Sequence, residues 1–355
     1  RNNRNSMKKF DAILDNFALE ARPLNVSHLG DGLINDTYMV ETDRPDLRYV
    51  LQRINHCVFQ DVDGLQRNID AVTRHLRGKM ADFPDPDRHV LRFIPCRATG
   101  RSYCRVGADY WRVSVYIPGT VTIKEVTAET AASAGRAFGR FEAMLTDLRE
   151  PLIETIPDFH NMELRLHQLR VAVASDPVSR VDSVRPIVEA IEARASEMTV
   201  AERLGREGKL PRRLCHCDTK VNNMLIDAVT GEVLCVIDLD TVMPSFVFSD
   251  YGDFLRTGAC TAAEDEPDLS KIDFDMDIYR AFTDGYLSEA ESFLTPLERS
   301  MLPFAVRLFP YMQATRFLTD YINGDTYYKT TGPEHNLVRT RAQLALLDAI
   351  DRRLP

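Results

Sequence analysis

Four polar residues between positions 216 and 238 have types and a spacing that could do chemistry. His216 and Asp218 lie in the stretch LCHCDTKVNNML, Asn223 follows five residues after Asp218, and Asp238 follows 15 residues after Asn223. Phosphotransferases use an aspartate in a loop to orient the acceptor hydroxyl, and an asparagine with a second aspartate to hold Mg²⁺. Mg²⁺ prefers hard oxygen ligands of this kind. The spacing therefore predicts Asp218 as a catalytic residue and Asn223 and Asp238 as metal ligands.

The CHC run around His216 raises a zinc site as an alternative. A structural zinc site needs about four ligands, usually from two separated pairs, and the sequence contains no second CxxC or HxxxH pair. In an extended segment Cys215 and Cys217 share one face and His216 points to the other. We therefore expect two cysteines packed as small apolar residues, and we expect His216 to fix the catalytic loop through hydrogen bonds.

The residues between Asn223 and Asp238 predict a β-hairpin. MLID and EVLCVID are strand-like, and Gly231 lies in the turn between them. Such a hairpin would bring Asn223 and Asp238 side by side. The alternative is that Asp218 and Asp238 cap turns and that Asn223 is an ordinary turn residue.

The elements around this hairpin predict an α+β protein. The first third of the chain is mainly strand-like, and the rest is mainly helical apart from the β-rich island 214–240. The expected strands are 37–41, 48–54, 89–94 and 110–117, and the expected helices are 62–77, 128–148, 162–174, 183–204, 276–292, 297–322 and 336–353.

The change from strands to helices predicts two lobes. A strand-rich N-terminal lobe over 8–117 is followed by a linker at 118–120, where Pro118 and Gly119 break the pattern. A helical lobe over 121–355 then contains the hairpin. Residues 1–7 read as a tag remnant or a disordered arm.

Bulk properties exclude several classes of protein. The net charge of −9 argues against nucleic acid as a partner. There is no apolar run of about 18 residues for a membrane span and no apolar segment of a secretory signal at the start. Seven scattered cysteines suit buried thiols in a reducing compartment. We therefore expect a cytoplasmic protein with a small-molecule partner, without nucleic acid or membrane, that is a monomer or a weak homodimer.

Several segments resemble the aminoglycoside phosphotransferase and choline kinase superfamily, and most closely its N-acetylhexosamine 1-kinase branch. They run from about residue 28 to residue 343 and include HLGDGLINDTYMVET, YVLQRIN, DTKVNNMLIDAVTG, VIDLDTVMP, DYGDFLR, TRFLTDYINGD and PEHNLVRTRAQ. The resemblance implies a two-lobe, protein-kinase-like fold with a small antiparallel sheet in the N-lobe. It also implies transfer of the γ-phosphate of ATP, with Mg²⁺, to a sugar hydroxyl in carbohydrate metabolism. The expected product is the 1-phosphate of an N-acetylhexosamine.

The resemblance also implies an ATP site in the strand-rich lobe. Gly30 and Gly32 would form the loop over the phosphates. Two glycines at this spacing fit an ordinary hairpin turn equally well. The backbone of Tyr116 and Ile117, next to the linker, would hydrogen-bond adenine.

Kinases of this fold carry a phosphate-binding lysine on the third strand, and this chain has none there. Arg53 in YVLQRIN, or alternatively Gln52, would take its place, with Asp70 as the partner carboxylate of Arg53. The other reading of Arg53 is a solvated residue at the end of a strand.

The acceptor site is expected in the helical lobe, where polar groups must bind hydroxyls. Asp253, Arg256, Arg316 and Tyr327 are the candidates, with Arg339 and Arg341 as further arginines, although several could form internal salt bridges. Asp250 is expected to support the catalytic loop through hydrogen bonds. Leu33 departs from the polar residue expected in the glycine loop, and the exact sugar therefore stays open.

Two alternative functions remain. One is a kinase for choline, homoserine or an aminoglycoside. Choline needs an aromatic cage, and the single tryptophan, Trp111, lies in the N-terminal lobe. The other is a catalytically inactive nucleotide-binding regulator. The complete set of Asp218, Asn223 and Asp238 argues against it.

Overall fold

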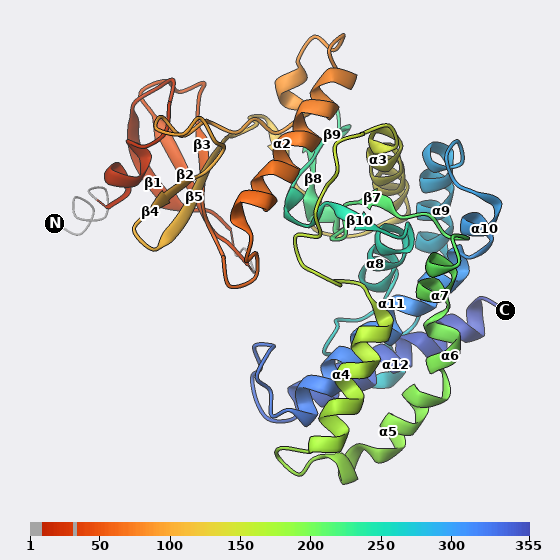
Figure 1. The fold of residues 1–355 in the computed structure, drawn as a ribbon. Helices are drawn as coiled ribbons and strands as arrows, with labels where there is room; N and C mark the ends of the chain where they lie inside the picture. The colour runs from red at the N-terminus through yellow and green to blue at the C-terminus, as the bar shows by residue number, and fades with distance from the viewer. Residues whose placement is uncertain (1–8, 31–33) are drawn as a thin grey trace. The chain divides into compact units, whose positions relative to one another are not determined.

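The computed structural model describes residues 9–30 and 34–355, so the predicted terminal arm 1–7 lies outside the described residues. The chain divides into two compact units (Figure 1). Unit 1 holds the chain up to Thr122 and the segments 147–157 and 224–242, and unit 2 holds the segments 123–146, 158–223 and 243–355. The hairpin therefore belongs to unit 1, whereas the sequence placed it in the C-terminal lobe.

Unit 1 contains an antiparallel sheet with the strand order β1-β2-β3-β5-β4. Its hydrophobic core includes Tyr49, Leu51 and Val113, which are fully buried, and helical residues 9–14 pack against the same cluster. The strands are β1 Pro23–His28, β2 Asp36–Thr42, β3 Tyr49–Ile54, β4 Cys104–Val106 and β5 Asp109–Val115.

Helix α2 (Val62–Lys79) lies between β3 and β4 in the chain and has an apolar stripe, because Leu65, Ile69, Val72 and Leu76 repeat at helical spacing and are buried. The Asp61 side chain caps its first turn by accepting a hydrogen bond from the backbone N–H of Gly64. The 3-10 helix η1 (Pro86–Arg88) comes next in the chain.

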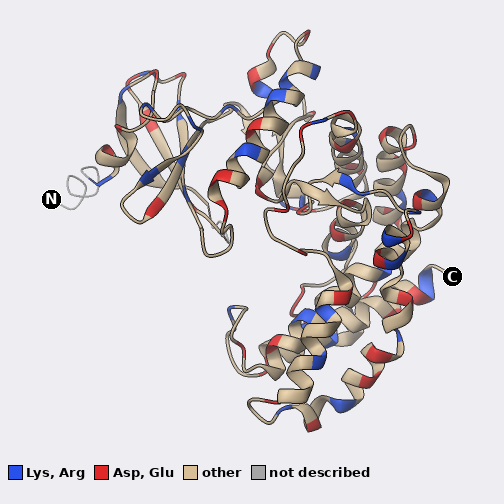
Figure 2. Ribbon diagram, in the orientation of Figure 1, with Lys and Arg blue, Asp and Glu red and all other residues tan. Residues whose placement is uncertain are grey.

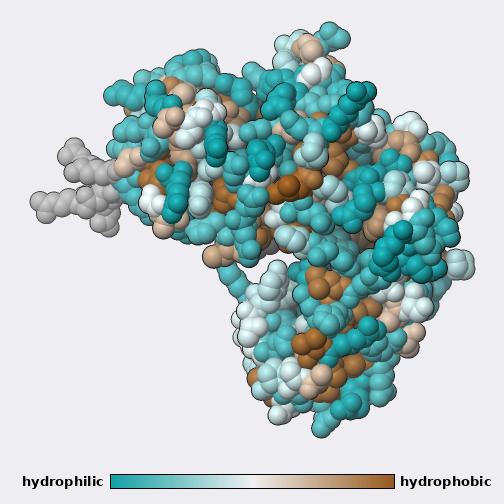
Figure 3. Space-filling view, viewed as in Figure 1, coloured by the Kyte–Doolittle hydropathy of each residue, from teal (hydrophilic) through white to brown (hydrophobic). Residues whose placement is uncertain are grey.

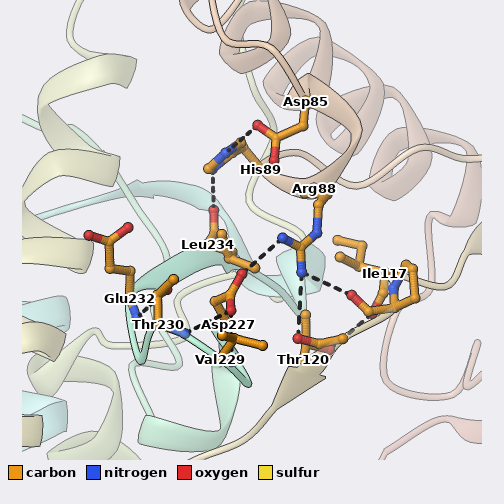
Figure 4. Close-up of polar contacts among 12 residues, drawn as sticks. Asp85, Arg88, His89, Ile117, Thr120, Asp227, Val229, Thr230, Glu232 and Leu234 are labelled. Carbon is orange, nitrogen blue, oxygen red and sulfur yellow. Dashed lines mark hydrogen bonds and ion pairs between the residues drawn. The ribbon is translucent and has the colours of Figure 1, made fainter.

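A second, three-stranded sheet in unit 1 joins the predicted linker to the hairpin. Its strands are β6 (Thr120–Val121), β8 (Met224–Asp227) and β9 (Val233–Val236), in the order β6-β8-β9. The Arg88 side chain connects the parts of this sheet: its guanidinium donates to the Asp227 carboxylate at 2.9 Å (Figure 4). It also donates to the Pro118 carbonyl at 3.0 Å. These contacts connect β8 to the chain around Arg88 and Pro118, which explains why the hairpin belongs to unit 1.

Unit 2 is mostly helical and also contains the short antiparallel pair β7 (Arg213–Cys215) and β10 (Met243–Ser245). Its helices are α3 Ala128–Leu145, α4 Met162–Ser175, α5 Val181–Ala193, α6 Ala195–Met198, α7 Val200–Arg206, α8 Phe248–Gly258, α9 Met276–Ala290, α10 Pro296–Ser300, α11 Leu302–Ile322 and α12 His335–Arg353. The 3-10 helices η2 (Val221–Asn223) and η4 (Leu269–Lys271) complete unit 2, and η3 (Leu239–Thr241) lies in unit 1.

The α+β class is confirmed, and most predicted elements are found. The strand predicted at 89–94 is wrong, because only Phe93 forms an isolated bridge, to Ser114 of β5. The helix predicted over 183–204 is divided into α5, α6 and α7, and the helix predicted over 297–322 is divided into α10 and α11. Strands β1, β4, β6 and β10 and helix α8 were not expected.

In the part of the chain that the structure describes, every helix is too short or too polar to span a membrane. The face drawn in Figure 3 is mostly hydrophilic, with hydrophobic residues in small separate groups.

Candidate active site

The loop after β7 presents Asp218 in unit 2. The Nζ of Lys220 lies 3.1 Å from one carboxylate oxygen of Asp218, and the Nδ2 of Asn223 lies 3.4 Å from the other. Asn223 also donates to the Asp218 backbone carbonyl at 2.8 Å, and this bond closes the loop. The Asp218 side chain is 23% exposed, so its carboxylate is held in position and still open on one side.

Asp250, in the first turn of α8, holds this loop in place through hydrogen bonds. Its carboxylate accepts hydrogen bonds from the backbone N–H groups of His216 and Cys217 at 2.9 and 2.8 Å, and its carbonyl accepts from the Thr219 hydroxyl at 2.8 Å. The bonds hold Cys217 at a φ of +64°, a backbone conformation that costs energy in a residue other than glycine. The expectation that Asp250 supports the loop is confirmed.

His216 and the two cysteines are part of the core. His216 is fully buried between the rings of Phe138 and Phe141, and its Nδ1 accepts from the backbone N–H of Asp218 at 3.3 Å. Burial raises the pKa of the Cys215 and Cys217 thiols well above 9.0. This supports packed thiols and a loop-fixing histidine, as the sequence predicted.

The predicted hairpin forms. Met224 of β8, the residue directly after Asn223, pairs with Val236 of β9, two residues before Asp238. Asn223 is the last residue of its segment in unit 2, and Asp238 lies in unit 1, with a φ of +59°. Their joint role as metal ligands stays a prediction.

The ion pair expected between Arg53 and Asp70 is not formed. Arg53 contacts the carboxylates of Asp36 at 2.5 Å and Asp109 at 3.8 Å near the end of β3, where all three side chains are about half exposed. Asp70 instead bonds to Ser102, and burial raises the pKa of the Asp70 carboxyl above 3.8. The reason is strand alternation, because Arg53 points to the face opposite its neighbour Gln52.

The face of the sheet toward α2 carries a different arginine, Arg112 of β5. Register pairs Gln52 with Arg112, and the Arg112 Nε donates to the Gln52 side chain at 2.9 Å. The Arg112 guanidinium also donates to Gln66 of α2 at 2.9 Å and to both oxygens of Asp240 at 2.5 and 2.8 Å. Arg112 and Asp240 are almost fully buried, so this is a desolvated bidentate pair.

Asp240 joins this network to the chain after the hairpin. Its carboxylate also accepts from the Asn35 side chain at 2.9 Å, and its carbonyl accepts from the Thr155 hydroxyl at 2.7 Å. Burial works against the charge of Arg112, but Asp240 and then Asp238 raise the pKa of the guanidinium. The network therefore fixes the segment that carries Asp238, and the sequence did not reveal it.

The expected ATP residues are placed as follows. Gly30 has a φ of +67°, which suits glycine, and Gly32 lies outside the described residues, as does Leu33. The N–H of Tyr116 is used by the Arg48 carbonyl at 2.9 Å, and the Ile117 carbonyl accepts from the Thr120 hydroxyl at 2.9 Å. Contact of these residues with a nucleotide stays a prediction.

A small pocket within unit 2 contains four of the predicted residues. Its volume is about 130 Å³ and its wall is formed by Phe159, His160, Cys217, Asp218, Lys220, Asp253, Arg256, Phe309, Met312, Gln313 and Arg316. Pockets for drug-sized ligands are usually about 300–1,000 Å³, so this one fits a compact group. Aromatic, acidic and basic side chains together can bind the ring and the polar groups of a small hydroxyl compound.

Tyr327 lies beside this pocket and is not part of its wall. It is 73% exposed, and its hydroxyl is 3.5 Å from the Nη2 of Arg316. Arg339 donates to the Lys329 carbonyl and to Asn336, and Arg341 is exposed.

Sequence reasoning missed one charged residue of the pocket wall, Lys220, and assigned otherwise Glu264, which pairs with a wall residue. Lys220 pairs with Asp218, and its position two residues later in the catalytic stretch was an available signal. Glu264, which read as part of a solvated acidic loop, pairs with Arg256 at 2.5 Å. Asp253 lies 3.9 Å from the same arginine, so Arg256 is compensated by two acids.

The buried acid Asp253 should make the stability of the protein depend on pH. Burial raises the pKa of its carboxyl from 3.8 to about 6, with Arg256 opposing and Asp218 adding to the rise. Between these values the folded protein holds a proton that the unfolded chain has released. The free energy of unfolding therefore falls as pH rises through this range, by about 3 kcal/mol for such a shift.

Asp253→Asn should remove this dependence. We expect the difference in unfolding free energy between wild type and variant to fall by a few kcal/mol from pH 4 to pH 6, measured by urea unfolding. The two proteins must be compared because His160 adds a pH dependence of its own. Burial, followed by the charges of Arg316 and Arg165, lowers the pKa of His160 to about 3. This makes the free energy of unfolding rise with pH in wild type and variant alike, so the contribution of His160 cancels in their difference. Parallel curves for wild type and variant would contradict the prediction.

The comparison with known families identifies the chain. Residues 25–285 match the phosphotransferase enzyme family, and this region covers most of the 355 residues. The protein belongs to this family. The match includes the catalytic loop, the hairpin and helix α8.

Solved structures show the same fold at low sequence identity. An aminoglycoside phosphotransferase from Alicyclobacillus acidocaldarius is 14% identical with a TM-score of 0.58, covering 97% of this chain and 95% of that one. Spectinomycin phosphotransferase in complex with ADP and spectinomycin is 11% identical with a TM-score of 0.57, covering 97% and 96%. Choline kinase from Cryptosporidium parvum is 14% identical with a TM-score of 0.56, covering 99% and 98%.

Proposed function

We propose that the protein is an ATP-dependent kinase that phosphorylates a sugar hydroxyl, namely the anomeric hydroxyl of an N-acetylhexosamine, giving the sugar 1-phosphate. The observation that carries the proposal is the position of the Asp218 carboxylate in the wall of the small pocket of unit 2. The loop that carries it is held by hydrogen bonds from the backbone N–H groups of His216 and Cys217 to Asp250. Membership of the phosphotransferase family supports the reaction type. The sugar rests on the resemblance to the hexosamine branch.

Asp218 performs the proton chemistry in this proposal. Its carboxylate accepts a hydrogen bond from the acceptor hydroxyl, orients the oxygen toward the γ-phosphorus and takes the proton late in the transfer. His216 and Asp250 act through the loop backbone and do not touch the acceptor. Asp253, Arg256, Arg316 and the neighbouring Tyr327 are proposed to bind the acceptor's other polar groups.

We propose Asn223 and Asp238 as ligands of Mg²⁺. An amide oxygen and a carboxylate are the hard donors that this ion prefers, and the Nδ2 of Asn223 is already used by Asp218, which leaves its oxygen as the donor to a metal. When bound, Mg²⁺ would neutralise phosphate charge.

The proposed nucleotide is ATP, since the spectinomycin phosphotransferase was solved with ADP. Gly30, Gly32, Arg53, Tyr116 and Ile117 are proposed to contact it. Asp70 keeps no role as a partner of Arg53.

The other acceptors fit the pocket less well. Choline and aminoglycosides are cations, and the Arg316 guanidinium in the pocket wall would repel them. The wall contains the rings of Phe159, His160 and Phe309 but no tryptophan, which is the strongest aromatic ligand for a quaternary ammonium. We further propose a cytoplasmic, monomeric or weakly dimeric protein. All seven cysteines are free thiols, which suits a reducing compartment.

A ³¹P NMR experiment tests the proposal. The protein is incubated with Mg·ATP and, separately, N-acetylglucosamine, N-acetylgalactosamine, galactose, glucose, choline, homoserine or kanamycin. We expect a sugar 1-phosphate signal that depends on Mg²⁺. Phosphate on choline, homoserine or kanamycin alone would keep the kinase and exclude the hexosamine. ATP binding without transfer to any compound would favour the inactive regulator.

A further inference from the structure

The unit 2 pocket contains arginine charge that no acid compensates. Its wall has two acids, Asp218 and Asp253, and Lys220 and Arg256 pair with them. Arg316, on α11, forms no ion pair with any residue in 9–30 or 34–355. Its guanidinium instead lies 5.7 Å from the ring centres of Tyr327 and Tyr328.

The acid one helical turn after Arg316 is used elsewhere. Asp320 is buried and accepts hydrogen bonds from the backbone N–H groups of Thr326, Tyr327 and Tyr328, at 2.8 to 3.0 Å. These bonds fix the loop whose two tyrosine rings flank Arg316. The surroundings of Arg316 are therefore ordered without a carboxylate against it.

A second arginine, Arg165 of α4, lies next to Arg316. It donates to the Phe159 carbonyl at 2.8 Å and to Gln168 at 3.1 Å, but its buried Nε has no hydrogen-bond partner. Phe159 is itself in the pocket wall, so Arg165 stands directly behind that wall. In Figure 2, α4 and α11 both carry Lys or Arg segments.

The electrostatics agree with two arginines that lack an anion. Burial and then the charge of Arg316 lower the pKa of Arg165 to about 10. The same two arginines help to keep His160 neutral, so this histidine adds no charge of its own. An oxyanion bound in the pocket would offset the repulsion between the two guanidinium groups.

We propose that the acceptor carries an anionic group, a carboxylate or a phosphate monoester, which Arg316 binds in this pocket while Arg165 adds positive charge from behind the wall. The inference rests on the proposed sugar kinase and narrows its substrate class to an anionic sugar. Asp218 then faces the hydroxyl that reacts, while Arg316 binds the oxyanion and the charge of Arg165 adds to the attraction. Guanidinium groups suit this role because their planar donors match both kinds of oxyanion.

Matched acceptors test the inference in the full-length protein. N-acetylglucosamine is compared with its 6-phosphate, and glucose with glucuronic acid, because each pair differs in charge and keeps the anomeric hydroxyl. For at least one anionic member we expect kcat/KM at least about 10-fold above the neutral parent, since hydrogen bonds to charged groups have this size. The pair that shows the preference distinguishes phosphate from carboxylate.

Arginine variants locate the effect. Arg316→Gln should lower kcat/KM for the preferred anionic sugar by about 10- to 100-fold and Arg165→Gln by a smaller factor, and each variant should lower it less for the neutral parent. Arg316→Lys keeps the charge and should retain part of the preference. Arg170→Gln is the matched control, since Arg170 lies on the same helix α4 and pairs with Glu192 at the surface. Equal losses for charged and neutral sugars, or a wild-type preference for neutral sugars, would overturn the inference.

Binding without ATP separates this inference from the proposed kinase. Isothermal titration calorimetry uses the same four sugars with wild type and Arg316→Gln. Stronger binding of an anionic sugar that is lost in Arg316→Gln, without phosphoryl transfer, would keep the anion subsite and remove the sugar kinase. Transfer to neutral sugars with no added binding of the charged ones would keep the kinase and overturn the subsite.

Discussion

Asp218→Asn is expected to lower kcat by a factor on the order of 10² or more, with little change in KM for either substrate. The amide cannot take the proton of the acceptor hydroxyl, and general-base groups of this kind contribute about 10²- to 10⁴-fold. The fold should survive, because the carboxylate contacts only the half-exposed Lys220 and, weakly at 3.4 Å, Asn223. The bond that closes the loop uses the Asp218 backbone carbonyl and is unchanged in the variant.

The measurement is the steady-state rate of ADP release with the acceptor found by ³¹P NMR, together with the melting temperature. Asp182→Asn is the control, since Asp182 is 93% exposed on α5 and pairs only with Arg185. It should leave both quantities unchanged. If Asp218→Asn kept a rate near that of wild type while folded, Asp218 would not be the base, and the inactive regulator would gain support.

Local pattern was enough to predict the hairpin and to single out the loop of Asp218 as a candidate. Spacing between Asp218 and Asn223 is a property of one short segment, and so are the alternation of β8 and β9 and the turn at Gly231. The structure pairs β8 with β9, with Met224 opposite Val236. Even so, no local pattern revealed that these strands pair with β6 and group with unit 1.

Contacts across strands could not be predicted in the same way. The choice of Arg53 over Gln52 depends on which face of β3 points toward α2, and a strand buried on both sides gives no clear alternation. Register places Gln52 opposite Arg112, and Arg53 opposite Trp111. The buried cation therefore comes from the neighbouring strand, 60 residues later, and its partner Asp240 comes 128 residues after that.

Helix α8 was missed for a different reason. Its sequence FSDYGDFLRTG contains two glycines and two aspartates, which usually indicate a loop. Tertiary packing explains Gly252, because a Cβ there would lie 2.5 Å from the Ala305 carbonyl oxygen of α11. The glycine permits two helices to approach closely, and only the fold shows that neighbour.

Arg112→Met is expected to lower the free energy of unfolding of unit 1 by about 3–5 kcal/mol. Removing one partner of a buried ion pair leaves the other charge without compensation, and a loss of this size is typical. Asp240 would keep only the Asn35 side chain as a donor to its carboxylate. Fluorescence of Trp111, the single tryptophan of the chain, follows urea unfolding of unit 1 directly, because this residue lies buried next to Arg112 in β5.

Arg53→Gln is the matched control for this experiment. It removes an arginine from the same sheet, but its ion pairs with Asp36 and Asp109 are about half exposed. Exposed pairs contribute about 0–1 kcal/mol, so this variant should unfold almost as wild type does. Equal losses in the two variants would show that Asp240 does not depend on Arg112.

A double variant then separates charge from packing. Arg112→Met with Asp240→Leu removes both charges, and replacing a buried pair by apolar residues is often neutral or stabilising. We expect it to be more stable than Arg112→Met alone. It should nevertheless have a raised requirement for Mg²⁺, because Asp240 lies two residues after the proposed ligand Asp238 and its bonds to Asn35 and Arg112 fix that segment. If stability recovers but Mg²⁺ affinity does not, the Arg112–Asp240 pair serves to position the proposed ligand Asp238. If both recover, the pair serves only the stability of the fold.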